Sequence, residues 1–159
     1  MPQEFIYFRS PIGTIKISGN EDGISSVIFI DEKMETSNNI PEFFKLCLIQ
    51  LEEYFKGTRE EFNLKLNRGG TVFQNSVWDE LEKIPFGKTR TYMEQTKCLG
   101  DIKAIRAVAS ANGKNPISII IPCHRVIGSN GSLTGYAGGI WRKKWLLEHE
   151  NPSRQTSLF

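Results

Sequence analysis

The chain has 159 residues, of which 39% are hydrophobic and 24% are charged, and its formal net charge is +2. These values describe an ordinary soluble globular protein, long enough for one compact domain or two small lobes. No apolar run approaches the roughly 18–20 residues of a membrane span and no leader-like segment opens the sequence, so we expect a cytoplasmic protein without a membrane partner.

The charge is unevenly distributed along the chain. Residues 1–69 hold eight Lys and Arg against eleven Asp and Glu, a net −3, whereas residues 70–159 hold twelve against seven, a net +5. A basic half that follows a mildly acidic one indicates that the C-terminal half binds a polyanion.

The first 69 residues predict an antiparallel sheet followed by a helix. Short β-branched or aromatic segments, residues 5–8, 13–18 and 25–30, are separated by strong turn signals. Pro41 then opens a pattern of apolar residues at helical spacing that Gly57 ends, and residues 62–66 alternate as a further strand would. This region contains no cluster of reactive side chains, so we interpret it as a scaffold.

The C-terminal half predicts a helix-turn-helix. Residues 67–70 are typical of a linker, and Thr71 can cap a helix that ends near Ile84. Two short helices follow, with a glycine turn at Gly100 between them and the second covering residues 102–112. In the second helix Ile105 and Val108 face inward, which leaves a face of small residues and a single arginine: Arg106, Ala107, Ser110 and Ala111. Such a face suits close approach to a nucleic-acid groove, although a helix buried on both sides has the same composition.

Cys123 is the candidate nucleophile. An apolar run, residues 117–121, predicts a buried strand that Pro122 ends, so Cys123 stands where a rigid element stops. His124 and Arg125 follow directly, and such neighbours favour the reactive thiolate. The other two cysteines, Cys47 and Cys98, are interpreted as core residues. With an odd number of widely spaced cysteines and only two histidines, neither a disulfide framework nor a metal site is expected.

A glycine-rich loop and a last helix complete the chain. Residues 128–139 lack the context of a phosphate-binding loop, and their glycines suit close backbone approach to a flat ligand. The helix over residues 140–150 has three basic positions, Arg142, Lys143 and Lys144, that we expect to be exposed. Glu150 at its end offers a carboxylate that orients His124 if the helix packs behind the nucleophile.

These segments resemble the O6-alkylguanine-DNA alkyltransferases (methylated-DNA–protein-cysteine methyltransferases). The resemblance rests on the active-site signature Ile-Pro-Cys-His-Arg-Val at residues 121–126 and extends over about residues 70–150; the matching motifs lie at residues 70–74, 84–89, 106–112 and 136–139. It implies an α+β protein with an N-terminal α/β lobe (residues 1–69), a mostly helical C-terminal domain with a helix-turn-helix (residues 70–152) and a flexible tail (residues 153–159).

The resemblance also implies the reaction and the roles of its residues. The nucleotide is flipped out of duplex DNA, and Cys123 takes the alkyl group from O6 of guanine, or more weakly from O4 of thymine, in one irreversible step without a cofactor. His124 acts through a water with Glu150, Asn115 braces the turn, and Arg106 replaces the flipped base in the stack. The implied base pocket comprises Tyr92, Val126, Tyr136, Ala137 and Gly138. The implied DNA contacts are Tyr92, Arg106, Ala107, Ser110, Ala111, Arg125 and Ser129.

The sequence departs from the family pattern at one pocket position. Ala137 stands where many relatives have Ser, which removes one possible hydrogen bond to O6 and leaves the alkyl-group preference open. Lesion binders of this family that do not repair have Trp at the nucleophile position, and Cys123 argues against that subclass. The zinc ligands that some relatives carry in the N-terminal lobe have no matching Cys and His set here.

Two other functions remain as alternatives. A cysteine hydrolase or acyltransferase accounts for Cys123 and His124 but not for the helix-turn-helix. A DNA-binding regulator with a non-catalytic cysteine accounts for the helix-turn-helix but not for Cys123 and His124. The C-terminal peptide, residues 155–159, resembles the segment by which bacterial repair proteins dock on the sliding clamp, although a match of five residues arises often by chance and a tail folded onto its own surface is the favoured interpretation. We otherwise expect a monomer.

Overall fold

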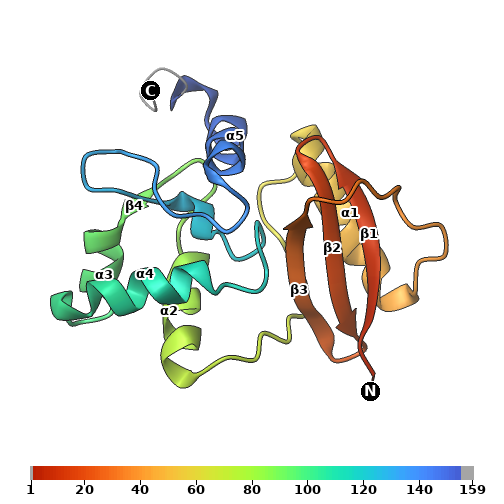
Figure 1. Ribbon diagram of the computed structural model, residues 1–159, viewed down its shortest axis with the longest axis horizontal. Helices are drawn as coiled ribbons and strands as arrows, with labels where there is room; N and C mark the ends of the chain where they lie inside the picture. The colour runs from red at the N-terminus through yellow and green to blue at the C-terminus, as the bar shows by residue number, and fades with distance from the viewer. Residues whose placement is uncertain (1, 155–159) are drawn as a thin grey trace. The chain divides into compact units, whose positions relative to one another are not determined.

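The computed structural model describes residues 2–154 and divides into two compact units, with the boundary between Gly69 and Gly70 (Figure 1). The first unit combines a sheet with one helix, and the second is mostly helical, which confirms the predicted α+β class. None of the helices described is long and apolar enough to cross a membrane.

The first unit is a three-stranded antiparallel sheet covered by a helix. Strands β1 (Glu4–Ser10), β2 (Gly13–Asn20) and β3 (Gly23–Ile30) lie in chain order, joined by tight turns. Alternate residues such as Ile15, Ile17 and Val27 are fully buried, because side chains of a strand alternate between faces. Helix α1 (Glu42–Lys56) packs across the sheet in Figure 1 and ends at Gly57, whose φ of 82° is the left-handed conformation of a helix C-cap.

The predicted strand over residues 62–66 is wrong. Only Leu66 forms a bridge, parallel to Ile24 of β3, and the residues before it have no regular structure. The side chain of Gln50 in α1 accepts a hydrogen bond from the Asn63 backbone N–H (2.9 Å) and donates one to its carbonyl (3.2 Å). The Asn63 backbone is thereby satisfied by a side chain instead of a neighbouring strand.

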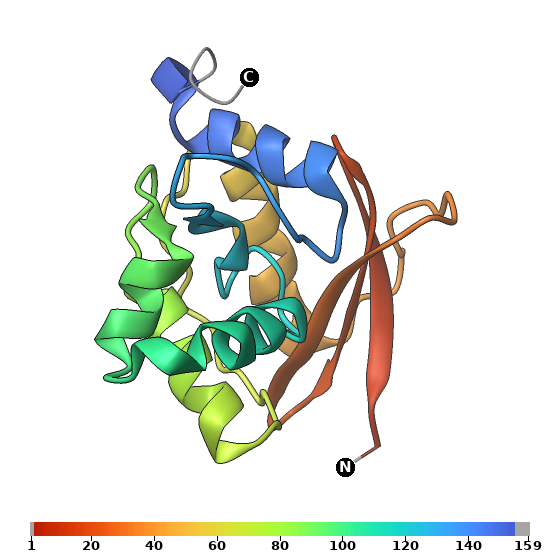
Figure 2. The same ribbon diagram turned by 60° about the vertical axis from the view of Figure 1, so that its left-hand side comes forward.

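The second unit begins with helices whose ends are fixed by local capping. Helix α2 (Val72–Glu82) starts with a capping box between Thr71 and Gln74, and α3 (Tyr92–Cys98) starts with one between Thr91 and Glu94. After a turn and the short η1 (Ile102–Ala104), α4 (Ile105–Gly113) lies beside α3, as Figure 2 shows. The two helices of the predicted helix-turn-helix are therefore both present, and the indole N–H of Trp78 in α2 donates to the Ala111 carbonyl at 2.9 Å.

The predicted strand over residues 117–121 is also wrong, because this segment folds as tight turns. The Ile120 N–H donates to the Ser118 carbonyl at 2.8 Å, which closes a three-residue turn centred on Ile119. Ile119 has φ of 72°, a left-handed conformation that is strained for a β-branched residue. A second three-residue turn, from the Cys123 N–H to the Ile121 carbonyl at 2.8 Å, is centred on Pro122.

The rest of the second unit surrounds these turns. The 3-10 helix η2 (Cys123–Arg125) runs into β5 (Val126–Ile127), which pairs in parallel with β4 (Arg90–Thr91), a two-stranded sheet that the sequence did not predict. A loop leads to α5 (Ile140–Glu150), and η3 (Pro152–Arg154) follows. The apolar core of this unit includes Val77, Leu81, Val108, Ile121 and Leu146.

Candidate active site

Cys123 opens η2 and is 9% exposed. Burial raises the pKa of its thiol, because a thiolate is poorly solvated inside a protein. A hydrogen bond from Asn115 and the positive charge of Lys143 act in the opposite direction and lower that pKa. The thiol is therefore buried away from water, and two groups, Asn115 and Lys143, favour its ionised form.

Asn115 braces the turns that carry Cys123. Its amide nitrogen donates to the Ile121 carbonyl at 2.7 Å, and its amide oxygen accepts from the Ile117 N–H at 3.0 Å. One side chain thus satisfies backbone groups on both sides of the strained residue Ile119.

Glu150 joins His124 and Arg125 from the end of α5. Its Oε2 lies 2.7 Å from Nε2 of His124, and its two oxygens accept from the Arg125 guanidinium at 2.7 and 3.1 Å. The same guanidinium donates to the Ile84 carbonyl at 2.7 Å. All three charged or titratable side chains are buried, so these hydrogen bonds act in a low-dielectric environment.

The protonation states in this cluster follow from burial and pairing. Burial alone would raise the pKa of Glu150, but His124 and Arg125 outweigh it and hold the carboxyl pKa well below its usual range. Burial lowers the pKa of His124, with Glu150 partly opposing it, so the imidazole is neutral near pH 7. Its second ring nitrogen, Nδ1, is buried and has no hydrogen-bond partner among residues 2–154. A neutral ring that Glu150 orients can accept a proton at Nδ1.

Three expectations about charged and thiol side chains are wrong. Arg125 does not assist the thiol, because its guanidinium is bound to Glu150 and Ile84 and it is only 6% exposed. Lys143 is not exposed but fully buried, and it supplies the positive charge near Cys123 that sequence reasoning assigned to Arg125. Cys98 is exposed and is no core residue, whereas Cys47 is buried as expected.

A pocket lies between the start of α3, α4 and the loop before α5. It has a volume of 550 Å³ and is lined by Tyr92, Ile105, Arg106, Ala109, Gly113, Thr134, Gly135, Tyr136 and Ala137. Four predicted site residues, Tyr92, Arg106, Tyr136 and Ala137, are therefore brought together. Val126 and Gly138 are not among its lining residues, and Val126 is fully buried.

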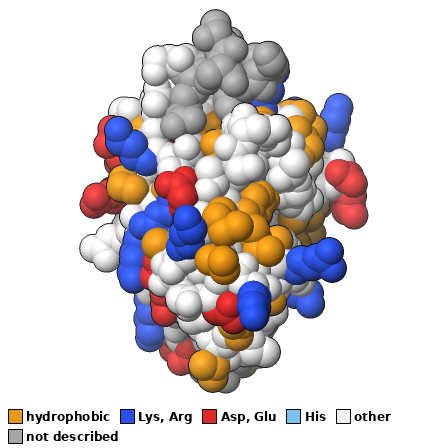
Figure 3. All heavy atoms as spheres, turned by 90° about the vertical axis from the view of Figure 1, so that its left-hand side faces the viewer, with side chains coloured by type: hydrophobic (Ala, Val, Ile, Leu, Met, Phe, Trp, Pro, Cys, Tyr) orange, Lys and Arg blue, Asp and Glu red, His pale blue; other side chains and the backbone are white. Residues whose placement is uncertain are grey.

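The residues predicted to contact DNA differ in exposure. Arg106, Ala107 and Ser110 are exposed, as is Ser129 in the loop, but Ala111 is 3% exposed and packs inside the unit. Ala111 is therefore no candidate DNA contact, and neither is Arg125, which is buried in its own ion pair. Figure 3 faces the side on which α3 and α4 lie, and it shows apolar side chains gathered in a patch with Lys and Arg side chains around it.

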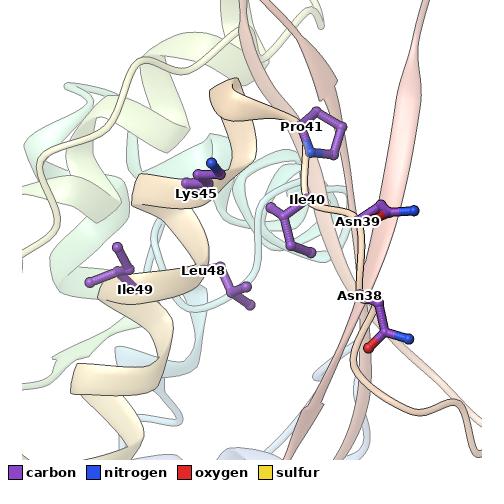
Figure 4. Close-up of a pocket in the computed structure, with 7 residues that line it drawn as sticks. All are labelled: Asn38, Asn39, Ile40, Pro41, Lys45, Leu48 and Ile49. Carbon is purple, nitrogen blue, oxygen red and sulfur yellow. The ribbon is translucent and has the colours of Figure 1, made fainter.

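The first unit has a cavity of its own, which Figure 4 shows at the start of α1. Its volume is 660 Å³ and its lining is Asn38, Asn39, Ile40, Pro41, Lys45, Leu48 and Ile49. This lining holds no nucleophile and no acid–base pair. In residues 2–154 there is also no group of three or more Cys, His, Asp or Glu side chains that could hold a metal ion.

Comparison with known proteins places both units in one family. Residues 72–152 match the model of the 6-O-methylguanine DNA methyltransferase DNA-binding domain, and residues 5–67 match that of the 6-O-methylguanine DNA methyltransferase ribonuclease-like domain. The chain belongs to the 6-O-methylguanine DNA methyltransferase family. The family assigned from the sequence is thereby confirmed.

Individual members of the 6-O-methylguanine DNA methyltransferase family are similar over nearly the whole chain. The methylated-DNA–protein-cysteine methyltransferase of Methanosarcina acetivorans is 49% identical over 151 residues, which cover 92% of this chain and 97% of the relative. That of Mycobacterium tuberculosis (strain H37Rv) is 45% identical over 160 residues, covering 96% and 97%.

Solved structures of the family give the same result. The crystal structure of M. tuberculosis O6-methylguanine methyltransferase superposes with a TM-score of 0.85 at 41% identity, covering 95% of this chain and 94% of the other. The structure of M. tuberculosis OGT in complex with DNA superposes with a TM-score of 0.82 at 41% identity, covering 96% and 92%.

Proposed function

We propose that this chain repairs alkylated DNA by moving an alkyl group from O6 of guanine to the sulfur of Cys123. The bond between the alkyl carbon and O6 breaks as the carbon–sulfur bond forms, and guanine is restored. A thioether is not a leaving group, so each molecule acts once. The names of the relatives and the DNA complex of a similar protein support this proposal.

The observation that carries the proposal is the arrangement of Cys123, His124 and Glu150 inside one unit. Glu150 holds the imidazole through Nε2, which leaves Nδ1 to take the thiol proton, directly or through a water, as the thiolate forms. The restored guanine receives a proton in return. Asn115 is proposed to present Cys123 by bracing its turn, and it also lowers the pKa of the thiol.

The pocket beside α4 is proposed to receive the flipped nucleotide. An atom on O6 is out of reach inside a duplex, so the base must leave the stack. Arg106 is proposed to enter the space that the base leaves, while Tyr92 displaces the phosphate and contacts the base. Small exposed residues at positions 107 and 110 let the α4 backbone approach the groove, and Ser129 is proposed as a further contact.

The walls of this base site are proposed to come from two segments. Tyr136, Ala137 and Gly138 of the loop form one wall, and the backbone carbonyls of Cys123 and Val126 form the other. O4-alkylthymine is proposed as a weaker substrate at the same site. Ala137 lacks the hydroxyl with which a Ser would bind O6, so its side chain offers no hydrogen bond to the base.

Intact mass measurement tests the proposal. The protein is mixed with a duplex oligonucleotide that carries one O6-methylguanine, and Cys123→Ala serves as the control. We expect a gain of about 14 Da that maps to Cys123 and saturates at one equivalent, because the activated thiolate is consumed. Binding without a mass gain would indicate a lesion binder, and turnover beyond one equivalent would indicate a cysteine hydrolase.

We further propose that the protein works as a cytoplasmic monomer associated with DNA. Its proposed docking peptide for a sliding clamp, residues 155–159, lies outside the described residues, as does most of the predicted tail. A chain truncated after Ser153 tests the docking proposal. If the truncated chain binds the clamp as well as the full chain does, the peptide has no such role.

A further inference from the structure

Lys143 is a fully buried lysine that the proposed reaction does not yet use. It lies in the first turns of α5, between two other basic residues. Lysine is almost never fully buried unless it is paired, because its ammonium loses its hydration. A buried lysine in this position therefore requires partners that compensate for the lost water.

The partners of Lys143 belong to the pocket. Its Nζ donates a hydrogen bond to the Thr134 carbonyl at 2.8 Å, and the same carbonyl accepts a hydrogen bond from the Tyr92 hydroxyl at 3.2 Å. Nζ also lies 5.7 Å from the centre of the Tyr92 ring, within the range of a cation–π contact. One carbonyl oxygen therefore connects α5, the loop and the first residue of α3.

Both residues that Lys143 contacts line the 550 Å³ pocket. A carbonyl has two lone pairs, so it can accept from Lys143 and from Tyr92 at once. If Nζ were removed, Thr134 would keep only the longer of these two hydrogen bonds, and the loop would lose its connection to α5 at this atom. Lys143 thus connects α5 to the same carbonyl that accepts the hydrogen bond from Tyr92.

The charge of Lys143 also acts on the nucleophile. Burial lowers the pKa of Lys143 to about 8, and the negative charge of Cys123 acts in the opposite direction. In return the ammonium lowers the pKa of the Cys123 thiol. The neighbouring Arg125 does not replace this charge, since it is bound to Glu150.

We propose that Lys143 is a positioning residue of the transfer reaction, whose protonated Nζ holds Thr134 and Tyr92 as one wall of the base pocket and favours the thiolate of Cys123. The inference rests on the proposed function for its substrate. Its effect on Cys123 can nevertheless be measured without DNA. A buried lysine with a purely structural role would affect folding stability and leave the pH dependence of Cys123 unchanged.

The pH dependence separates these two roles. The groups whose charges interact with Lys143 are Cys123 and His124 in η2, and Tyr92 in α3 faces it with its ring. His124 is neutral near pH 7, and burial raises the pKa of Tyr92. The transfer rate should therefore rise with pH as Cys123 ionises and level off above about pH 8, where Lys143 loses its proton.

The test measures single-turnover transfer by the full chain from an O6-methylguanine duplex between roughly pH 6 and 9.5, a range that includes the titration of Lys143. Lys143→Gln removes the charge, Lys143→Arg keeps a charge that does not titrate in this range, and Lys144→Gln is the matched control. We expect Lys143→Gln to lose roughly tenfold or more in rate near neutral pH, the loss that one unit of thiol pKa produces. We expect the rate of Lys143→Arg to go on rising above pH 8, where that of wild type levels off, and Lys144→Gln to behave as wild type.

A second measurement needs no DNA. Alkylation of Cys123 by iodoacetamide, followed by peptide mass mapping, gives the apparent pKa of the thiol, which we expect to be higher in Lys143→Gln than in wild type. This result would support the action of Lys143 on Cys123 even if O6-methylguanine DNA were not a substrate. Equal thiol pKa values and equal transfer profiles in a folded Lys143→Gln would overturn the proposal. If that variant does not fold, a rate that levels off at the same pH in wild type and Lys143→Arg overturns it.

Discussion

Glu150 binds two consecutive residues, His124 and Arg125, with a single buried carboxylate. Its Oε2 lies 2.7 Å from His124 Nε2, and its Oε1 lies 2.7 Å from Arg125 Nε. The carboxylate thereby fixes the imidazole beside the nucleophile and neutralises an arginine that is almost fully buried. The same contact has a catalytic and a structural consequence, and the two can be measured separately.

Glu150→Gln should destabilise the protein strongly. It leaves the buried Arg125 guanidinium without an anionic partner, and removal of one member of a buried ion pair costs about 3–5 kcal/mol. Chemical denaturation followed by circular dichroism measures the free energy of unfolding. The control is Glu42→Gln, whose ion pair with Lys45 is largely exposed and should change stability by less than about 1 kcal/mol.

The stability difference between wild type and Glu150→Gln should depend on pH. The carboxyl pKa is lowered in the folded state, so its contribution is fully present above the unfolded value of about 4.3 and is lost as the pH falls below it. Buried neutral His124 lowers the stability of both proteins as the pH falls below about 6.5, so the contribution of Glu150 is obtained from their difference. Unfolding free energies of both proteins at a series of pH values check this. A difference that stays constant down to pH 3 would contradict it.

At position 119 the glycine variant should be at least as stable as the alanine variant, which reverses the usual order of stability. Replacing this buried side chain by Ala should cost about 2–5 kcal/mol through lost packing. Ile119→Gly should be at least as stable as Ile119→Ala, because φ of 72° strains any residue with a Cβ.

The matched pair of variants for this prediction is at Ile121. That residue is equally buried and has no positive φ. There glycine should be less stable than alanine by about 1 kcal/mol, the ordinary cost of its backbone freedom. If Ile119→Gly were also less stable than Ile119→Ala, the backbone strain at position 119 would not contribute to stability.

Arg106→Ala should slow transfer from duplex DNA while leaving the protein folded. Arg106 is exposed and lines the pocket, so its removal costs little stability but leaves the space of the flipped base unfilled. A loss of about 2 kcal/mol, or roughly 30-fold in rate, is expected from the unstacking energy. Single-turnover transfer measures this loss.

Two controls make the role of Arg106 specific. Lys103→Ala removes another exposed cation from the adjacent η1 and should have a smaller effect. Transfer from a single-stranded oligonucleotide should be nearly unchanged in Arg106→Ala, because no duplex stack has to be opened. An equal loss with both substrates would instead indicate that Arg106 contacts the phosphates or the base.

The sequence by itself determined the features that depend on neighbouring residues. The capping boxes at Thr71 and Thr91, the turns between the first three strands and the glycine that ends α1 all involve residues within a few positions of one another. Cys123 was assigned as the nucleophile from its immediate neighbours and from a family signature of six residues. Hydrogen bonds between neighbouring residues and the local spacing of apolar residues can therefore be inferred from the sequence.

Only the tertiary structure decided where the charges of the site lie. Lys143 belongs to a basic run that predicts a solvated helix face, yet packing of α5 against the loop and α3 buries it beside Tyr92 and Thr134. Arg125 follows the nucleophile directly but binds Glu150, 25 residues further along the chain. The apolar residues around Ile119 suit a strand as well as a turn. Contacts between distant segments decide which strand a segment can pair with and which cation lies near a given side chain. Local sequence does not encode these contacts.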